Sequence, residues 1–154
     1  YFHDMTLIDN LKAIGEIQIE NQHDMNSKIN QLISKFELDA VRKVEAKFLS
    51  GGMKRRLVIS MSLLGEPDIL LMDEPLVALD PQTIQMLQTI IIKLQSEYNL
   101  TILITDHQAR DLLVVCDKAI ILSNSKIVAE GTPNELIRNE NATKHYFGDN
   151  FKFK

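Results

Sequence analysis

The sequence is poor in features that would point to several common classes of protein. It has a single cysteine, Cys116, among 154 residues, so an internal disulfide is impossible and no CxxC or His-rich cluster offers a metal site. A chain with so little cysteine is expected in a reducing compartment. No apolar run approaches the roughly 18 residues that a membrane-spanning helix requires.

Positive charge is also scarce. Seventeen Lys and Arg residues face twenty-one Asp and Glu residues, which gives a net charge of −4. A protein that binds the phosphate backbone of nucleic acid needs a basic surface, so nucleic acid is not an expected partner. Hydrophobic residues make up 45% of the chain, and its length suits about one domain. A folded globular core is therefore expected.

A third absence concerns phosphate binding. No stretch has the form G-x-x-x-x-G-K-[ST], because none of the six glycines begins one. The chain also begins with Tyr1 instead of methionine, and it shows no signal-peptide pattern. The initial tyrosine raises the expectation that the sequence is a piece of something longer.

Residues 1–48 are predicted to be helical. Residues 6–9 resemble a capping box with aspartate in place of glutamate, and they open a helix with apolar residues on one side. A second helix is predicted from four residues at i, i+3, i+4 and i+7: Ile29, Leu32, Ile33 and Phe36. The polar residues 20–26 predict a loop between the two helices, and residues 41–44 suggest a shorter third helix.

Residues 49–154 show an alternation of helices and strands. Two short apolar runs, 69–72 and 101–105, are typical of strands that are buried on both faces. Helices are predicted at 50–64, 80–98, 108–114 and 132–138, and a β-hairpin is predicted over 118–130. Strands separated by helices indicate an α/β fold with a parallel sheet.

Ser50, Gly51 and Gly52 form the first candidate binding element, at the start of a predicted helix. Small residues there let backbone N–H groups approach an anion, and the helix dipole adds about half a positive charge. An ordinary helix cap with a flexible approach explains the same residues equally well. Both interpretations stay open at this point.

Asp73 and Glu74 form the second candidate, directly after the strand predicted over 69–72. Ligands of open α/β sheets bind beyond the carboxyl ends of the strands. A carboxylate there can hold Mg²⁺ beside a nucleotide phosphate, and a second carboxylate can orient or deprotonate an attacking water. The alternative is a pair of carboxylates that caps the loop before Pro75.

His107 and Asp80 are the remaining candidates. His107 follows the strand predicted over 101–105, where a single histidine is more often structural than catalytic. Asp80 precedes Pro81, and this pair is typical of a helix N-cap followed by proline at the first helical position. Capping is therefore the primary expectation for Asp80 in isolation.

Taken together, the four candidates resemble the motifs of an ABC-transporter ATPase subunit. Residues 49–53 look like the signature motif, residues 69–75 like Walker B with its catalytic glutamate, residues 78–80 like the D-loop, and His107 like the switch histidine. They occur in the family's order and at its usual spacing. The resemblance implies a P-loop NTPase-like fold, with a helical subdomain before residue 49 and an α/β core after it.

The resemblance also implies a role for each candidate residue. Asp73 would help to hold Mg²⁺, Glu74 would act on the attacking water, and His107 would contact the γ-phosphate of ATP. Residues 50–52 would cover the ATP that is bound to a second ATPase subunit in a head-to-tail homodimer. Asp80 would link the two ATP sites.

A finer resemblance concerns what is transported. Residues 105–107, 116–117, 129–133 and 146–151 are most similar to the ATPases of lipopolysaccharide export, and residues 2–11 resemble the segment after their Q-loop. Branched-chain amino-acid importers share several of these residues, so an importer stays open as the alternative. Either system implies transmembrane permease subunits as partners and a cytoplasmic position at the inner face of the plasma membrane.

The missing phosphate-binding loop has a specific meaning within this family. The adenine-stacking aromatic residue and the Q-loop glutamine would also lie before Tyr1, so the chain is expected to be the C-terminal two-thirds of a subunit. Negligible ATP hydrolysis is expected of these residues alone, because the P-loop supplies most phosphate contacts. A second interpretation is a non-catalytic remnant or interaction module that lends only a signature helix to a complete partner.

Overall fold

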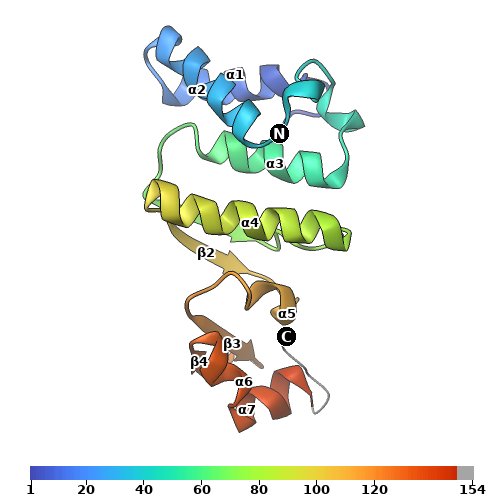
Figure 1. Ribbon diagram of the computed structural model, residues 1–154, viewed down its shortest axis with the longest axis vertical. Coiled ribbons are helices and arrows are strands. Elements are labelled where there is room, and N and C mark those ends of the chain that lie inside the picture. The colour runs from blue at the N-terminus through green and yellow to red at the C-terminus, as the bar shows by residue number, and fades with distance from the viewer. Residues whose placement is uncertain (149–154) are drawn as a thin grey trace.

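The computed structural model describes residues 1–148. The first part consists of helices and short 3₁₀ turns: α1 (Leu7–Gln18), α2 (Gln22–Lys35), η1 (Asp39–Val41), η2 (Ala46–Phe48) and α3 (Gly51–Ser62). Figure 1 shows α1 and α2 together at one end of the molecule, with α3 beneath them. Their apolar faces meet in a buried core that includes Leu7, Leu11, Ile29, Ile33, Phe36 and Leu57.

The start of α1 follows from the cap that the sequence predicts. The side chain of Thr6 accepts a hydrogen bond of 3.2 Å from the backbone N–H of Asp9. The Thr6 hydroxyl also donates to the Asp9 carboxylate at 2.5 Å. The bond from the Asp9 N–H satisfies one of the backbone donors that a helix N-terminus leaves free. The predicted amphipathic helix around Ile29 is confirmed as α2.

Two expectations for this part are wrong in detail. Residues 20–26 do not form a loop throughout, because α2 begins at Gln22, where the Asn21 side chain caps it by accepting from the N–H of His23 at 2.9 Å. Met25 then lies buried against the core, which favours helix over loop. The third helix shrinks to the single turn η1, since Val44 lies beyond it and its carbonyl accepts from the N–H of Leu7 at 2.9 Å.

The cap at Thr6 gives a prediction for stability. Thr6→Ala is expected to lower the free energy of unfolding by about 1 kcal/mol, because it removes the side-chain acceptor for the N–H of Asp9. Thr6→Ser keeps the hydroxyl and serves as the matched control, with little change expected. Urea unfolding followed by circular dichroism measures both variants. Equal unfolding midpoints for the alanine and serine variants would show that the cap contributes nothing.

A parallel pair of strands connected by a long helix follows: β1 (Ile69–Asp73), α4 (Pro81–Tyr98) and β2 (Thr101–Thr105). The strands pair in register from Ile69 opposite Thr101 to Asp73 opposite Thr105. The parallel pairing confirms the α/β expectation, because such strands need a crossover helix to connect them. It also brings the ends of both strands, and the residues that follow them, to one edge.

The expectation that both strands are buried on two faces is wrong for this structure. Leu70 and Met72 of β1 are buried beneath α4 and the helical layer, whereas Leu71 between them is 70% exposed. Leu103 of β2 is exposed in the same way, at 60%. The cause is that, within the described residues, no element covers the second face of the pair.

The last part is a small unit around an antiparallel hairpin. Its elements are α5 (Ala109–Leu112), β3 (Ala119–Ser123), β4 (Lys126–Gly131), α6 (Pro133–Ile137), α7 (Glu140–Ala142) and the π-helical turn η3 (Thr143–Phe147). The hairpin and the helix that opens with a capping box at Thr132 confirm the predicted elements, although α5 is shorter than predicted. Figure 1 places this unit at the end of the molecule opposite α1 and α2. Residues 149–151 of the C-terminal resemblance lie outside the described residues.

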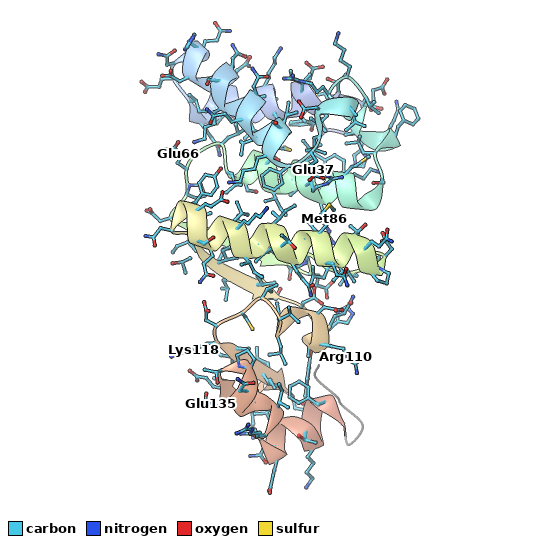
Figure 2. All side chains as sticks on the ribbon, in the orientation of Figure 1. Glu37, Glu66, Met86, Arg110, Lys118 and Glu135 are labelled. Atoms are coloured by element: carbon cyan, nitrogen blue, oxygen red, sulfur yellow. The ribbon has the colours of Figure 1, made fainter. Side chains whose placement is uncertain are left out.

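The helical layer is tied to the rest through α3 and α4. Arg56 of α3 is nine-tenths buried, and its guanidinium donates to the carbonyl of Phe36 at 2.8 Å, at the end of α2. Burial lowers the pKa of Arg56 from its usual value, and the charge of Glu37 acts in the opposite direction. A cavity of about 480 Å³ lies beside it, with Glu37 on one side and Met86 of α4 on the other (Figure 2).

No helix in the described part of the chain is long and apolar enough to cross a membrane.

Candidate functional site

The first candidate group lies at the shared edge where β1 and β2 end. Asp73 is the last residue of β1 and lies opposite Thr105, the last residue of β2. The Thr105 hydroxyl donates a hydrogen bond to the Asp73 carboxylate, which holds that side chain at the strand end. Asp73 therefore presents its carboxylate where ligands of α/β sheets bind, as the sequence predicts.

Glu74 continues from β1 in an unusual backbone conformation. Its φ is +47°, in the left-handed region that residues other than glycine rarely adopt. Such a conformation costs about 1–3 kcal/mol and persists only where the surroundings enforce it. Here the N–H of Glu74 donates to the carbonyl of Thr105 at 2.7 Å, which joins the turn to the end of β2. The backbone that carries the Glu74 carboxylate is therefore fixed by its bond to the end of β2.

Glu74 and His107 meet at this edge. The His107 Nδ1 atom lies 3.3 Å from Oε1 of Glu74, and both side chains are more than half exposed. The hydroxyl of Tyr146 donates to the backbone carbonyl of His107 at 3.0 Å. Burial, and then the negative charge of Asp106, raise the pKa of Tyr146 from its usual value. The end of β2 thus fixes the backbone of Glu74, and Tyr146 of the C-terminal unit fixes the backbone of His107.

Asp106 is a positioning residue to which sequence reasoning assigned no role. Its carboxylate accepts from the N–H of Leu76 at 3.2 Å and from the N–H of Gln108 at 2.8 Å. It therefore connects the loop after β1 to the loop after β2, and Glu74 and His107 sit in these loops. The available signal was its place directly after a predicted strand, but its partner Leu76 is 30 residues away in sequence.

The second candidate group is at the start of α3. The Ser50 side chain caps this helix by accepting from the N–H of Met53 at 3.3 Å. Gly52 is buried against α4, where an added Cβ would lie only 2.6 Å from Cγ2 of Thr83. Gly51 is exposed, and a Cβ there would meet only Leu79, at an ordinary 3.5 Å. One glycine thus allows close packing, while the other leaves the approach to the helix open.

Asp80 caps α4, as the sequence predicts. Its carboxylate accepts from the N–H of Gln82 at 3.1 Å and from the N–H of Thr83 at 3.0 Å. The Thr83 hydroxyl donates to it as well, at 2.6 Å. The Thr83 hydroxyl, and then the Thr83 backbone N–H, hold the pKa of Asp80 below its usual value.

One side chain bridges the two groups. Arg55 of α3 donates to the backbone carbonyl of Glu74 at 2.9 Å. Sequence reasoning missed this contact, because neither the charge nor the spacing of Arg55 distinguishes it from its neighbours Lys54 and Arg56. The structure therefore brings Asp73, Glu74 and His107 to one edge. The Arg55 bond connects that edge to the N-terminal half of α3.

Asp73 has the chemistry that a Mg²⁺ ion requires. Within residues 1–148, no group of three or more His, Cys, Asp or Glu side chains is arranged to hold a metal. Mg²⁺ beside a nucleotide is commonly held by one or two carboxylates together with the phosphates, and does not need a full protein cage. An oriented, exposed carboxylate fits such a site, and the Thr105 hydroxyl lies next to it.

A long groove adjoins this edge. It has a volume of about 1550 Å³ and runs from Asp73, Glu74 and His107 along β2 to the face of β3. Its walls combine the carboxylates at one end with aliphatic side chains such as Leu103 and Ile120. The candidate catalytic residues thus border open space large enough for a substantial ligand or chain segment.

Solved structures with the same fold are ATP-binding cassettes. MJ1267, an ATP-binding cassette of an ABC transporter, superposes with a TM-score of 0.82 over 95% of this chain and 64% of its own, at 24% identity. A putative metal-chelate type ABC transporter gives a TM-score of 0.82 over 93% of this chain and 58% of its own, at 23% identity. The P-loop NTPase-like fold of the ABC ATPases is thereby confirmed.

Sequence comparison identifies the family. The model of the ABC transporter family matches residues 1–77. The lipopolysaccharide export ATP-binding protein LptB is similar at 33% identity in Escherichia coli and 35% in Haemophilus influenzae, each over 98% of this chain and 63% of the relative. An ABC transporter ATP-binding protein of Rhizobium meliloti is 35% identical over 97% of this chain and 55% of its own length. The chain belongs to the ABC transporter family of ATP-binding proteins, and it spans less than two-thirds of these relatives.

Proposed function

We propose that this chain provides the hydrolytic edge and the signature helix of an ATP-hydrolysing subunit that powers lipopolysaccharide export. The observation that carries the proposal is the group at the ends of β1 and β2, where Nδ1 of His107 lies 3.3 Å from Oε1 of Glu74, beside Asp73. The similarity to LptB from two organisms supports the export system over other transporters.

The chemistry proposed for this edge follows from the three side chains. Glu74 accepts a proton from the attacking water, and its backbone keeps the carboxylate in place. His107 contacts the γ-phosphate, and its proximity to Glu74 supports a role for both groups at one reacting centre. When bound at Asp73, Mg²⁺ supplies charge neutralisation for the phosphate oxygens. Positioning and charge neutralisation are the main requirements of phosphoryl transfer.

We further infer that two such subunits assemble head to tail. In that arrangement Ser50, Gly51 and Gly52 of one subunit cover the ATP held by the other, and Asp80 links the two sites. The exposed Gly51 at the start of α3 is the feature that leaves room for a phosphate. Transmembrane permease subunits complete the transporter, and they hold the ATPase at the cytoplasmic face of the membrane.

The proposed division into a helical part, 1–48, and an α/β part, 49–154, follows the order of elements, although one buried core extends from α1 to β2.

The 154 residues by themselves are expected to hydrolyse ATP negligibly. Every test of hydrolysis therefore uses a complete subunit that carries these residues.

Mixed dimers test the head-to-tail arrangement. Gly51→Asp has space for its Cβ, so it should fold, but its negative charge should repel the phosphates and inactivate the homodimer. Glu74→Gln should inactivate the homodimer by a different route. If the signature acts on the other subunit's ATP, a dimer with one copy of each variant keeps one intact site. Co-expressed variants, separated by two affinity tags, are then expected to recover up to about half of the normal ATPase rate.

Two outcomes would contradict this proposal. An inactive mixed dimer, in which both variants still bind ATP, would show that the signature does not act across the interface. Normal hydrolysis by the Glu74→Gln homodimer would favour the interaction-module alternative, in which this chain contributes no hydrolytic carboxylate.

The transported substrate needs a separate test. The complete subunit is expected to restore lipopolysaccharide export in Escherichia coli cells that are depleted of LptB. Export is measured by labelling lipopolysaccharide that reaches the cell surface, with Glu74→Gln as the inactive control. Restoration of branched-chain amino-acid uptake in an importer mutant, without restored export, would favour the importer alternative.

A further inference from the structure

The backbone of Glu74 depends on contacts from outside its own loop. Its φ of +47° is unfavourable for a glutamate, so neighbouring groups have to enforce it. On the N–H side, the partner is the carbonyl of Thr105 at 2.7 Å. On the carbonyl side there are two donors, the Val77 N–H at 3.4 Å and the Arg55 guanidinium at 2.9 Å. The shorter of these two bonds comes from another element, α3.

Arg55 and Arg56 are adjacent in α3 but serve different places. Arg56 is buried and donates to the carbonyl of Phe36, so it secures the packing of α2 on α3. Arg55 is partly exposed, and it donates to the Glu74 carbonyl. A charged donor at a partly exposed position contributes little to global stability, but its bond fixes one peptide group with a defined direction.

We propose that Arg55 is a positioning residue for Glu74, because it anchors the peptide that carries this glutamate to α3 of the same subunit. Arg55 lies one helical turn after Ser50, Gly51 and Gly52 on α3. This inference rests on the proposed function, since it assigns Glu74 to hydrolysis.

The first test separates turnover from binding in complete subunits. Arg55→Met keeps most of the side-chain length but removes every donor, and it is expected to lower kcat by about 10- to 100-fold with KM for ATP unchanged. Arg55→Lys retains a charged donor and is expected to recover part of the rate. The matched control is Lys54→Met on the same helix, whose ammonium contacts the Lys47 carbonyl at 3.2 Å, away from Glu74. It should leave kcat unchanged.

The second test uses the mixed dimer of Gly51→Asp and Glu74→Gln subunits, in which one site is intact. That site combines Glu74 from the Gly51→Asp subunit with the signature from the other. Arg55→Met added to the subunit that retains Glu74 is expected to remove the recovered activity. The same change in the subunit that provides the intact signature should leave it nearly unaltered.

The outcomes distinguish this inference from the proposed function. Equal losses in the two mixed dimers, or a rise in KM and a fall in melting temperature that account for the lost rate, would overturn the role of Arg55. Unchanged kcat in the Arg55→Met homodimer would overturn it as well. Normal turnover by the Glu74→Gln homodimer would instead contradict the proposed function, whatever Arg55 does.

Discussion

Replacing Glu74 with glutamine is expected to lower ATP turnover by a complete subunit about 10²- to 10⁴-fold while ATP binding is retained. The amide keeps the shape of the side chain and can still receive a hydrogen bond, but it cannot take a proton from water. The backbone bonds of Glu74, through Thr105 and Arg55, do not involve the substituted group, so the loop should keep its conformation. Phosphate release measures turnover, and equilibrium binding of labelled ATP measures affinity.

Glu66→Gln is the matched control for this result. It makes the same chemical change at an exposed carboxylate, whose partner Lys28 lies in the helical layer away from the strand ends. Turnover should be normal in this variant. Weakened ATP binding with residual turnover in Glu74→Gln would show that Glu74 serves the nucleotide instead of the water.

Local chemistry explains why much of this fold could be predicted from the sequence. The caps at Thr6, Asp80 and Thr132 act on backbone groups two or three residues away, so their effect is visible in a short stretch. The apolar periodicity around Ile29 is equally local. For the same reason, the placement of Asp73 and Glu74 at a strand end followed from one run of apolar residues.

The features that were missed depend on contacts between distant segments. Asp106 acts on Leu76 across 30 residues, and Arg55 reaches Glu74 across 19. No periodic pattern marks such residues, because their partners are fixed only when β1, β2 and α3 pack together. The wrong expectation that both faces of the strands are buried has a similar cause. An apolar run shows that a strand can be covered on two sides, but the covering element has to come from elsewhere.

The same exposed strand face leads to the last prediction. Ile69 and Leu71 of β1 and Leu103 of β2 project from one side of the sheet and are 59%, 70% and 60% exposed. Contiguous apolar surface of this kind promotes association, and a two-stranded sheet is only marginally stable by itself. We therefore expect the 154-residue chain alone to bind the dye ANS and to self-associate. Its β1 amides should exchange hydrogen roughly two orders of magnitude faster than those of α3.

Substitutions on the two faces of β1 separate this effect from general instability. Leu71→Thr combined with Leu103→Thr should reduce dye binding and self-association with little change in unfolding temperature, because both side chains are exposed and threonine suits a strand. Leu70→Thr is the matched control on the same strand. Leu70 is only 5% exposed, so placing a hydroxyl there should destabilise the chain by about 1–3 kcal/mol without removing the apolar surface. A monodisperse monomer that binds no dye and protects β1 as strongly as α3 would contradict the prediction, since the apolar face would then have to be covered within the chain itself.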